Sequence, residues 1–166
     1  MNTLDDLFLH FLQDVFYAER QLLKALAKMV KSAQAPALKE AFSAHREETM
    51  HQIERLEQVF EKIGKPAKGV PCEAIKGLIE EAEEVIGDSQ PGPLRDAGLI
   101  ACGQAVEHYE IARYGALIAW ATAGGHTDVV GLLTQTINEE KKADKMLSDL
   151  AVKQINKAAA SLAKAA

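Results

Sequence analysis

Residues 99–118 read LIACGQAVEHYEIARYGALI, and this stretch decides the fold. Its apolar side chains recur every three or four residues, the period of an amphipathic α-helix that is buried along one face. At about 100° per residue, Glu107 and Glu110 straddle the centre of that face, each within roughly 30°. A buried carboxylate is costly unless positive charge or hydrogen bonds neutralise it. Taken alone, Glu107 and Glu110 are as compatible with boundary residues whose carboxylates reach water as with a binding site. The acids on the other helices distinguish these two interpretations.

Carboxylates also lie on the apolar face of two more segments that have the helical period. Glu140 and Asp144 lie within roughly 30° of the apolar centre of the last long segment, and Glu19 lies about 40° from the centre of the first. Glu139, next to one of these acids, points outward and needs no explanation. No Lys or Arg occupies the centre of a stripe, so we predict that bound cations neutralise the inward acids.

The second long segment offers two histidines, and the sequence leaves the choice between them open. Glu48 sits toward one edge of the stripe, and His51 three residues later completes the Glu-x-x-His pattern of di-iron carboxylate bundles. His51 falls far outside the apolar face, whereas His45 lies close to its centre. We favour His45 from the periodicity and keep His51 as the alternative from the motif. Gln52 also points inward and is a candidate donor to a metal ligand.

The chain is expected to be all-α, because it shows no sustained period-2 alternation and no Asn-Gly or Asp-Gly turn. Gly and Pro separate four long helices, expected at about 3–33, 36–63, 94–123 and 127–156. A short helix is expected at about 72–86, and an Ala/Lys-rich tail that frays at 157–166. The connections between the long helices are short, long and short. This order predicts a single domain over residues 1–166, a ferritin-like four-helix bundle whose long crossover carries the short extra helix.

Composition limits the location and the partners. The chain has 166 residues, of which 48% are hydrophobic and 26% are charged, and its net charge is −5. The negative charge gives no reason to expect nucleic acid or an anionic membrane surface as a partner. The apolar runs are too short to span a bilayer, no signal peptide is visible, and the two cysteines form no CxxC pair. We therefore expect a cytoplasmic protein without a membrane or nucleic-acid partner.

The inward acids together with one imidazole form a ligand set for a pair of transition metals. Carboxylates bridge two cations, and oxygen-rich sites with an imidazole suit iron or manganese, of which we favour iron. The predicted metal ligands are Glu19, His45 or His51, Glu48, Glu107, Glu110, Glu140 and Asp144.

Several strings resemble the YciF-like family, and together they cover nearly the whole chain. They are VEHYEIARYG at 106–115, AHREET at 44–49, NEEKKAD at 138–144, CEAIKGLIEE at 72–81 and the opening residues 7–26. The resemblance implies a ferritin-like four-helix domain, a homodimer and an association with bacterial stress responses.

The chain also resembles rubrerythrin at the metal ligands of that protein. The similar positions are Glu19, Glu48 with His51, Glu107-x-x-Glu110 and Glu140. Where rubrerythrin has a histidine after its last Glu, this chain has Asp144, which leaves the metal identity open. The rubredoxin module is absent, so the resemblance implies that a redox cycle needs an external electron donor.

These features fit three functions. The first is a di-metal oxidoreductase that oxidises Fe(II) or reduces peroxide under stress. In this function Glu48 and Glu140 bridge the two metals, Glu19 and Glu107 are terminal ligands, and Glu110 shifts between metal and solvent. The alternative is a structural or interaction protein that metal stabilises without turnover. The third is iron storage in a cage, although nothing in the sequence specifies a cage.

Overall fold

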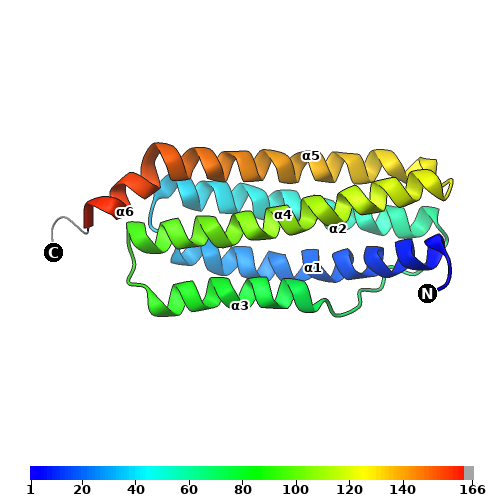
Figure 1. The fold of residues 1–166 in the computed structure, drawn as a ribbon, viewed down its shortest axis with the longest axis horizontal. Coiled ribbons are helices and arrows are strands. Elements are labelled where there is room, and N and C mark those ends of the chain that lie inside the picture. Colours follow the sequence, from blue (N-terminus) through cyan, green and yellow to red (C-terminus); the bar gives the residue numbers. More distant parts are fainter. Residues whose placement is uncertain (163–166) are drawn as a thin grey trace.

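The protein is a bundle of long helices, seen in a computed structural model that describes residues 1–162. Figure 1 shows the long helices side by side, with a shorter helix along one edge and another at one end. The helices are α1 (Leu4–Ser32), α2 (Pro36–Lys62), α3 (Glu73–Asp88), α4 (Pro93–Ala123), α5 (Thr127–Leu150) and α6 (Asn156–Leu162). No strand occurs among the described residues, and the prediction of an all-α helical bundle is confirmed.

The helices begin at residues whose chemistry favours a helix start. Thr3 caps α1, because its hydroxyl accepts a hydrogen bond from the Asp6 backbone N–H at 3.1 Å while the Asp6 carboxylate accepts one from the Thr3 N–H at 3.2 Å. Pro36 begins α2, where its missing N–H and fixed φ suit the first turn. Gly125, at a φ of 82°, makes the turn between α4 and α5, a backbone conformation that favours glycine.

The connections follow the predicted order of short, long and short. α1 and α2 form one antiparallel hairpin, and α4 and α5 form another (Figure 1). Between them the chain returns along the length of the bundle through residues 63–92, so α2 and α4 run in the same direction. α3 lies in this crossover and packs against α4 and α1.

One buried acid joins the two hairpins. Asp96, in the first turn of α4, accepts hydrogen bonds from the backbone N–H groups of Gln34 at 2.7 Å and Ala35 at 2.8 Å. It thereby satisfies two donors at the start of α2, whose N-cap residue Ala35 has no side chain to do so. The sequence analysis did not single out Asp96, because its partners are backbone groups on another helix.

The core contains two large hydrophobic layers, one toward each end of the bundle, and a smaller cluster of Ala18, Leu22, Cys72 and Ile75 where α3 meets α1. The first layer contains Phe8, Leu12, Phe16, Leu56, Phe60, Tyr114, Leu117, Leu133 and Ile137. The second layer contains Leu26, Met29, Leu38, Phe42, Leu99, Ile100, Leu147 and Ile155. Most of the buried polar residues of the long helices fall between the contributions to these two layers, namely Glu19, His45, Thr49, Gln52, Arg55, Glu107, Glu110 and Glu140. The fold thus places a polar layer in the middle of an apolar bundle.

The C-terminal part differs from the prediction. α5 passes through a π-helical turn, η1 (Ala151–Ile155), into α6, so residues 157–162 are helical instead of frayed. Ala and Lys are strong helix formers, and Ile155 is buried in the second hydrophobic layer, which anchors this turn. Residues 163–166 of the predicted tail lie outside the described residues.

Among residues 1–162, none of the helices combines the length and the apolar character needed to cross a membrane.

Candidate metal centre

Four side chains of the polar layer converge at the centre of the bundle. His45 comes from α2, Glu107 and Glu110 come from α4, and Glu140 comes from α5. One potential ligand atom from each lies within 4.8 Å of all the others, and all four residues are buried. The His45 Nε2 atom is 3.2 Å from Glu107 Oε1 and 3.6 Å from Glu140 Oε2. An imidazole of α2 therefore sits between carboxylates of α4 and α5.

Most polar atoms in this cluster have no hydrogen-bond partner within the protein. The buried atoms without one include Glu19 Oε2, His45 Nδ1, Glu107 Oε2, both oxygens of Glu110 and Glu140 Oε2. Buried polar atoms are nearly always paired in native proteins, and an unpaired one costs about 1–3 kcal/mol. So many unpaired acceptors in one place match the donor set that a bound transition metal requires.

Glu19 lies beside the cluster and extends it to α1. Its Oε1 atom accepts a hydrogen bond from the Tyr114 hydroxyl at 2.5 Å, while its other oxygen remains unpaired. Burial, followed by repulsion from Glu140, raises the pKa of Glu19 to about 8. Tyr114 belongs to the first hydrophobic layer, and its hydroxyl reaches from α4 to this acid on α1.

The other acids of the cluster also favour their protonated forms. Burial raises the pKa of Glu110 well above its usual range, and the negative charges of Glu19 and Glu140 raise it further. Burial likewise raises the pKa values of Glu107 and Glu140. Without a cation, the cluster therefore tends to hold protons in place of positive metal charge.

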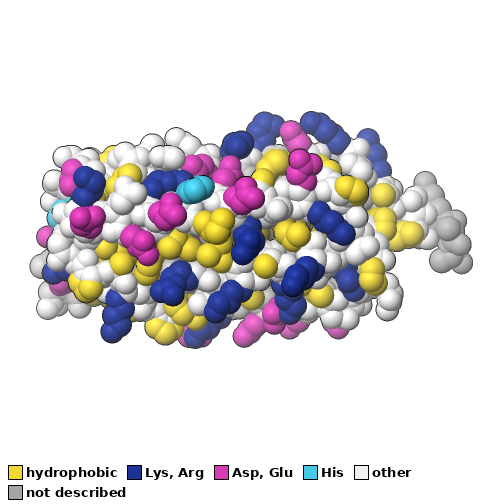
Figure 2. Space-filling model, turned by 180° about the vertical axis from the view of Figure 1, so that it is seen from behind, with side chains coloured by type: hydrophobic (Ala, Val, Ile, Leu, Met, Phe, Trp, Pro, Cys, Tyr) yellow, Lys and Arg dark blue, Asp and Glu magenta, His cyan; other side chains and the backbone are white. Residues whose placement is uncertain are grey.

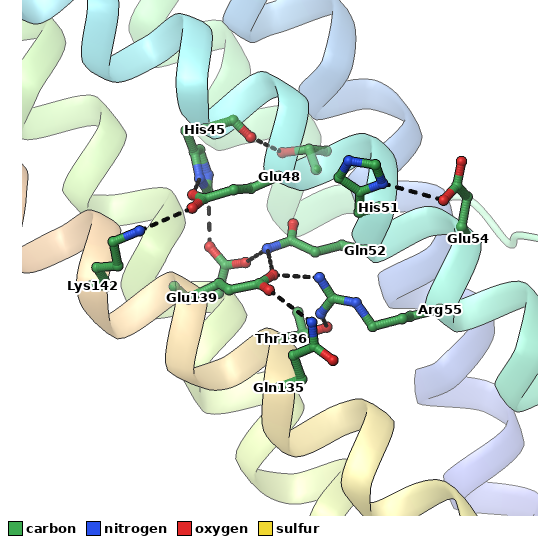
Figure 3. A network of polar contacts seen from close by, with 12 residues as sticks. His45, Glu48, His51, Gln52, Glu54, Arg55, Gln135, Thr136, Glu139 and Lys142 are labelled. Carbon is green, nitrogen blue, oxygen red and sulfur yellow. Dashed lines mark hydrogen bonds and ion pairs between the residues drawn. The ribbon is translucent and has the colours of Figure 1, made fainter.

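Glu48 lies at the rim of the cluster. Its side chain is 27% exposed, and its Oε2 atom is 3.7 Å from His45 Nδ1. Its Oε1 atom is 3.3 Å from the Nζ atom of Lys142, an exposed residue of α5. The neighbouring His45 imidazole and then the hydrogen bond from Lys142 lower the pKa of Glu48, whereas burial raises the pKa values of the inner acids. Figure 3 shows Glu48 between His45 and Lys142.

The structure does not bring His51 or Asp144 into the cluster. His51 points away from it (Figure 3), with a side chain that is 68% exposed and an Nδ1 atom 3.3 Å from Glu54 Oε2. The Glu-x-x-His motif fails here because three residues along α2 rotate His51 to the outer face. Asp144 is half-buried and accepts a hydrogen bond from Gln104 at 2.8 Å, with the exposed His108 Nε2 atom 3.4 Å away. It lies one turn beyond Glu140, and its short side chain does not reach back.

A buried cation lies near the cluster, although the sequence predicts no Lys or Arg at the centre of an apolar stripe. Arg55 of α2 is only 8% exposed, and it donates hydrogen bonds to Thr136 Oγ1 and to Glu139 Oε2, both at 2.5 Å. Glu139, which was expected to point outward, is half-buried in this ion pair. Gln52 faces inward as predicted and donates to both Glu139 and Glu140 (Figure 3). The ion pair spans α2 and α5, so the periodicity of a single helix gives no signal for it.

The cavity that His45 and Glu107 line is very small. Its volume is about 10 Å³, and its other walls are Ala41, Phe42, Ala143, Met146 and Leu147. Such a space holds about one water-sized sphere. Pockets for organic ligands are far larger, about 300–1,000 Å³. The cluster is therefore suited to ions and to molecules the size of oxygen or peroxide.

The positions of the two histidines give a direct test of which one binds metal. We expect His45→Ala to weaken metal binding by at least about 10-fold, because it removes the imidazole at the centre of the cluster. His51→Ala is the matched control and should leave binding unchanged, since its side chain lies on the outer face. Titration with Mn(II) or Fe(II) measures both, and equal losses in the two variants would refute this assignment.

The chain is similar over nearly its whole length to known proteins. The family described as "Domain of unknown function (DUF892)" matches residues 3–160. Protein YciF of Escherichia coli (strain K12) is 47% identical over 160 residues, which are 96% of each chain.

Solved structures agree with this similarity. The structure of the E. coli stress protein YciF has a TM-score of 0.90 at 47% identity, and the match covers 95% of this chain and 99% of that one. YcfI from Rhodopseudomonas palustris, named as a candidate structural protein, has a TM-score of 0.87 at 52% identity over 89% and 94% of the two chains. A Xanthomonas campestris protein with a TM-score of 0.73 and 19% identity shares the fold.

Proposed function

The chain belongs to the DUF892 family, and from this and its buried cluster we propose that it is a ferritin-like di-metal carboxylate protein that oxidises Fe(II) or reduces peroxide under stress. The proposal rests above all on the unpaired carboxylate oxygens that converge around His45 between two hydrophobic layers. The connection order of short, long and short supports the ferritin-like assignment. The name of E. coli YciF, a stress protein, supports the physiological role.

The donor set suits a pair of ions, with iron favoured over manganese. His45, Glu107, Glu110 and Glu140 would hold the metal, and Glu19 and Glu48 flank them on α1 and at the rim. These five carboxylates can offset the four positive charges of two divalent ions. Within the protein, the His45 imidazole lies among the inner acids and Lys142 contacts Glu48 at the rim. When bound, an iron pair supplies the electrons that oxygen or peroxide accepts.

The residues around the cluster determine what reaches it and in which state. The two hydrophobic layers exclude water above and below, and the 10 Å³ cavity restricts access to small molecules. The Tyr114 hydroxyl holds one oxygen of Glu19 and leaves the other free. The Glu48–Lys142 pair lies at the most exposed edge, so it marks the side from which ions and oxidant approach. A redox cycle at this site needs a source of electrons, and we propose that an external reductant supplies them.

Metal analysis followed by peroxide kinetics tests the function. We expect protein purified without tag or chelator to contain a pair of Fe or Mn ions per chain, and peroxide to oxidise bound Fe(II) faster than Fe(II) in buffer. Glu110→Ala and Glu140→Ala should abolish this acceleration, because each removes an inward ligand. Unchanged rates in both variants would overturn the proposed activity.

The alternative is a metal-stabilised structural or interaction protein without turnover. The name of the R. palustris relative favours it. So do the raised pKa values of the cluster acids, since metal that displaces their protons stabilises the fold by linkage. In the same experiment, a structural role predicts that the protein retains its metal through repeated additions of peroxide and that the peroxide is not consumed.

We also propose that the protein is a homodimer. Figure 2 shows a lengthwise band of hydrophobic side chains on the face behind the view of Figure 1, flanked by basic and acidic side chains. The α1–α2 hairpin carries a groove of about 680 Å³ whose lining includes Tyr17, Arg20, Leu23, Lys24, Ile53 and Glu57. A surface with apolar residues and both signs of charge suits a self-complementary contact with a second copy.

A further inference from the structure

The side-chain amide of Gln52 connects the candidate metal ligands to the buried ion pair. Gln52 is buried on α2, and its Nε2 atom donates one hydrogen bond to Glu140 Oε1 and another, at 3.2 Å, to Glu139 Oε2. A primary amide has two N–H donors, and here both are used. Its carbonyl oxygen in the same place would face two carboxylates, so the nitrogen must point toward α5.

The ion pair holds this amide in place from the far side. Arg55 donates to the same oxygen of Glu139 that accepts from Gln52, and it also donates to the buried Thr136 hydroxyl. Gln135 donates to the other oxygen of Glu139 at 3.3 Å. The contacts of Arg55 with Glu139 and Thr136 therefore hold in place the Glu139 oxygen that accepts from Gln52 (Figure 3).

The Gln52 amide engages one of the two carboxylate oxygens of Glu140. The Oε1 atom of Glu140 is occupied by the Gln52 amide, whereas its Oε2 atom is buried without a hydrogen-bond partner and lies 3.6 Å from His45 Nε2. Only one of its two oxygens is thus free toward the cluster. A carboxylate with one oxygen engaged in a charge-assisted hydrogen bond offers a metal the other one.

We propose that Gln52 is a positioning residue that limits Glu140 to a single free oxygen, Oε2, and that the Arg55–Glu139 pair holds Gln52 in the required orientation. This inference rests on the proposed metal site, and it adds the element that determines how one of its ligands is presented. Restricting Glu140 to one oxygen keeps a coordination position open for a small oxidant.

Gln52→Leu tests the proposal, because leucine fills a similar volume and donates no hydrogen bond. Co(II) is the probe, since its visible spectrum reports the number of ligands independently of activity. We expect Gln52→Leu to bind Co(II) about 10–100-fold more weakly than the wild type. We also expect its spectrum to shift toward higher coordination, because both oxygens of Glu140 become free.

Gln135→Leu is the matched control. It removes the long hydrogen bond of an exposed amide to Glu139 Oε1 but leaves the Oε2 atom, which accepts from Gln52 and Arg55, and Glu140 untouched, so its affinity and spectrum should equal those of the wild type. Gln52→Asn is the second variant if leucine impairs folding, as judged by circular dichroism. It keeps the amide but is one methylene too short to reach both acids, so the same losses are expected.

The outcomes separate this inference from the function on which it rests. Wild-type affinity and spectrum in a folded Gln52 variant would overturn the role of Gln52 and leave the metal site standing. An equal effect of Gln135→Leu would also overturn it, because the cause would then be Glu139 alone. A wild-type protein that binds neither Co(II) nor Fe(II) would overturn both proposals.

Discussion

The metal-free protein should lose stability as the pH rises from about 5 to about 8, whereas the metal-loaded protein should not. Burial, with repulsion from Glu140, raises the pKa of Glu19 from 4.5 to about 8. Burial also raises the pKa values of Glu107, Glu110 and Glu140. Between the unfolded and folded values, the folded state binds more protons than the unfolded state. The stabilisation is therefore complete below pH 4.5 and is lost as the pH rises through the folded pKa values.

The expected change is large for a protein of this size. One pKa unit corresponds to about 1.4 kcal/mol, so the buried acids together shift the free energy of unfolding by an amount on the order of several kcal/mol. Metal reverses the trend, because it displaces the protons and binds more tightly as the pH rises. Urea unfolding at several pH values, with chelator and with saturating Mn(II), measures both curves. A metal-free protein that becomes more stable between about pH 5 and 8 would contradict the raised pKa values.

Glu110→Leu should stabilise the metal-free protein at neutral pH and abolish metal binding. Glu110 is 1% exposed, and neither of its oxygens has a hydrogen-bond partner. Replacing buried ionisable groups by apolar residues of similar volume typically stabilises a protein by about 1–4 kcal/mol. Urea unfolding in chelator, together with elemental analysis after loading, measures the two effects. The expected gain is thus the free energy of unfolding that the wild type loses because it keeps an acid, Glu110, in its core as a metal ligand.

Glu139→Leu is the control for this prediction. It also removes an acid next to the cluster, but it leaves Arg55 buried without its partner. Removing one member of a buried pair is destabilising, by up to about 3–5 kcal/mol. A Glu110→Leu variant that is as destabilised as Glu139→Leu would show that Glu110 serves packing or an internal hydrogen bond in place of metal.

The sequence predicts the fold well because the helical period is strong and glycine and proline separate the segments. The predicted ranges agree closely with α1, α2, α4 and α5, and the lengths of the connections indicate the two hairpins. The C-terminal helix is the exception. Its Ala/Lys-rich composition and terminal position predict fraying, although the same residues favour helix once Ile155 anchors the turn.

The candidate site could be predicted in part, and the limit is physical. Rotation around a helix is encoded in the period of its residues, which is why His45 faces inward and His51 does not. Position along neighbouring helices is not encoded in that way. Asp144 has a suitable angle but lies one turn too far along α5, and Arg55 is buried only because Glu139 on another helix meets it.

The two hairpins share the cluster between them. The first hairpin carries Glu19 and His45, and the second carries Glu107, Glu110 and Glu140. Hairpin contacts are local and form faster than contacts across a long crossover. The pocket therefore comes into existence only when the hairpins dock, which we expect to be the last step of folding. During synthesis the first hairpin leaves the ribosome alone, with Glu19, the rim acid Glu48 and one imidazole, so an unfinished chain lacks the three inward acids of α4 and α5 that iron binding requires.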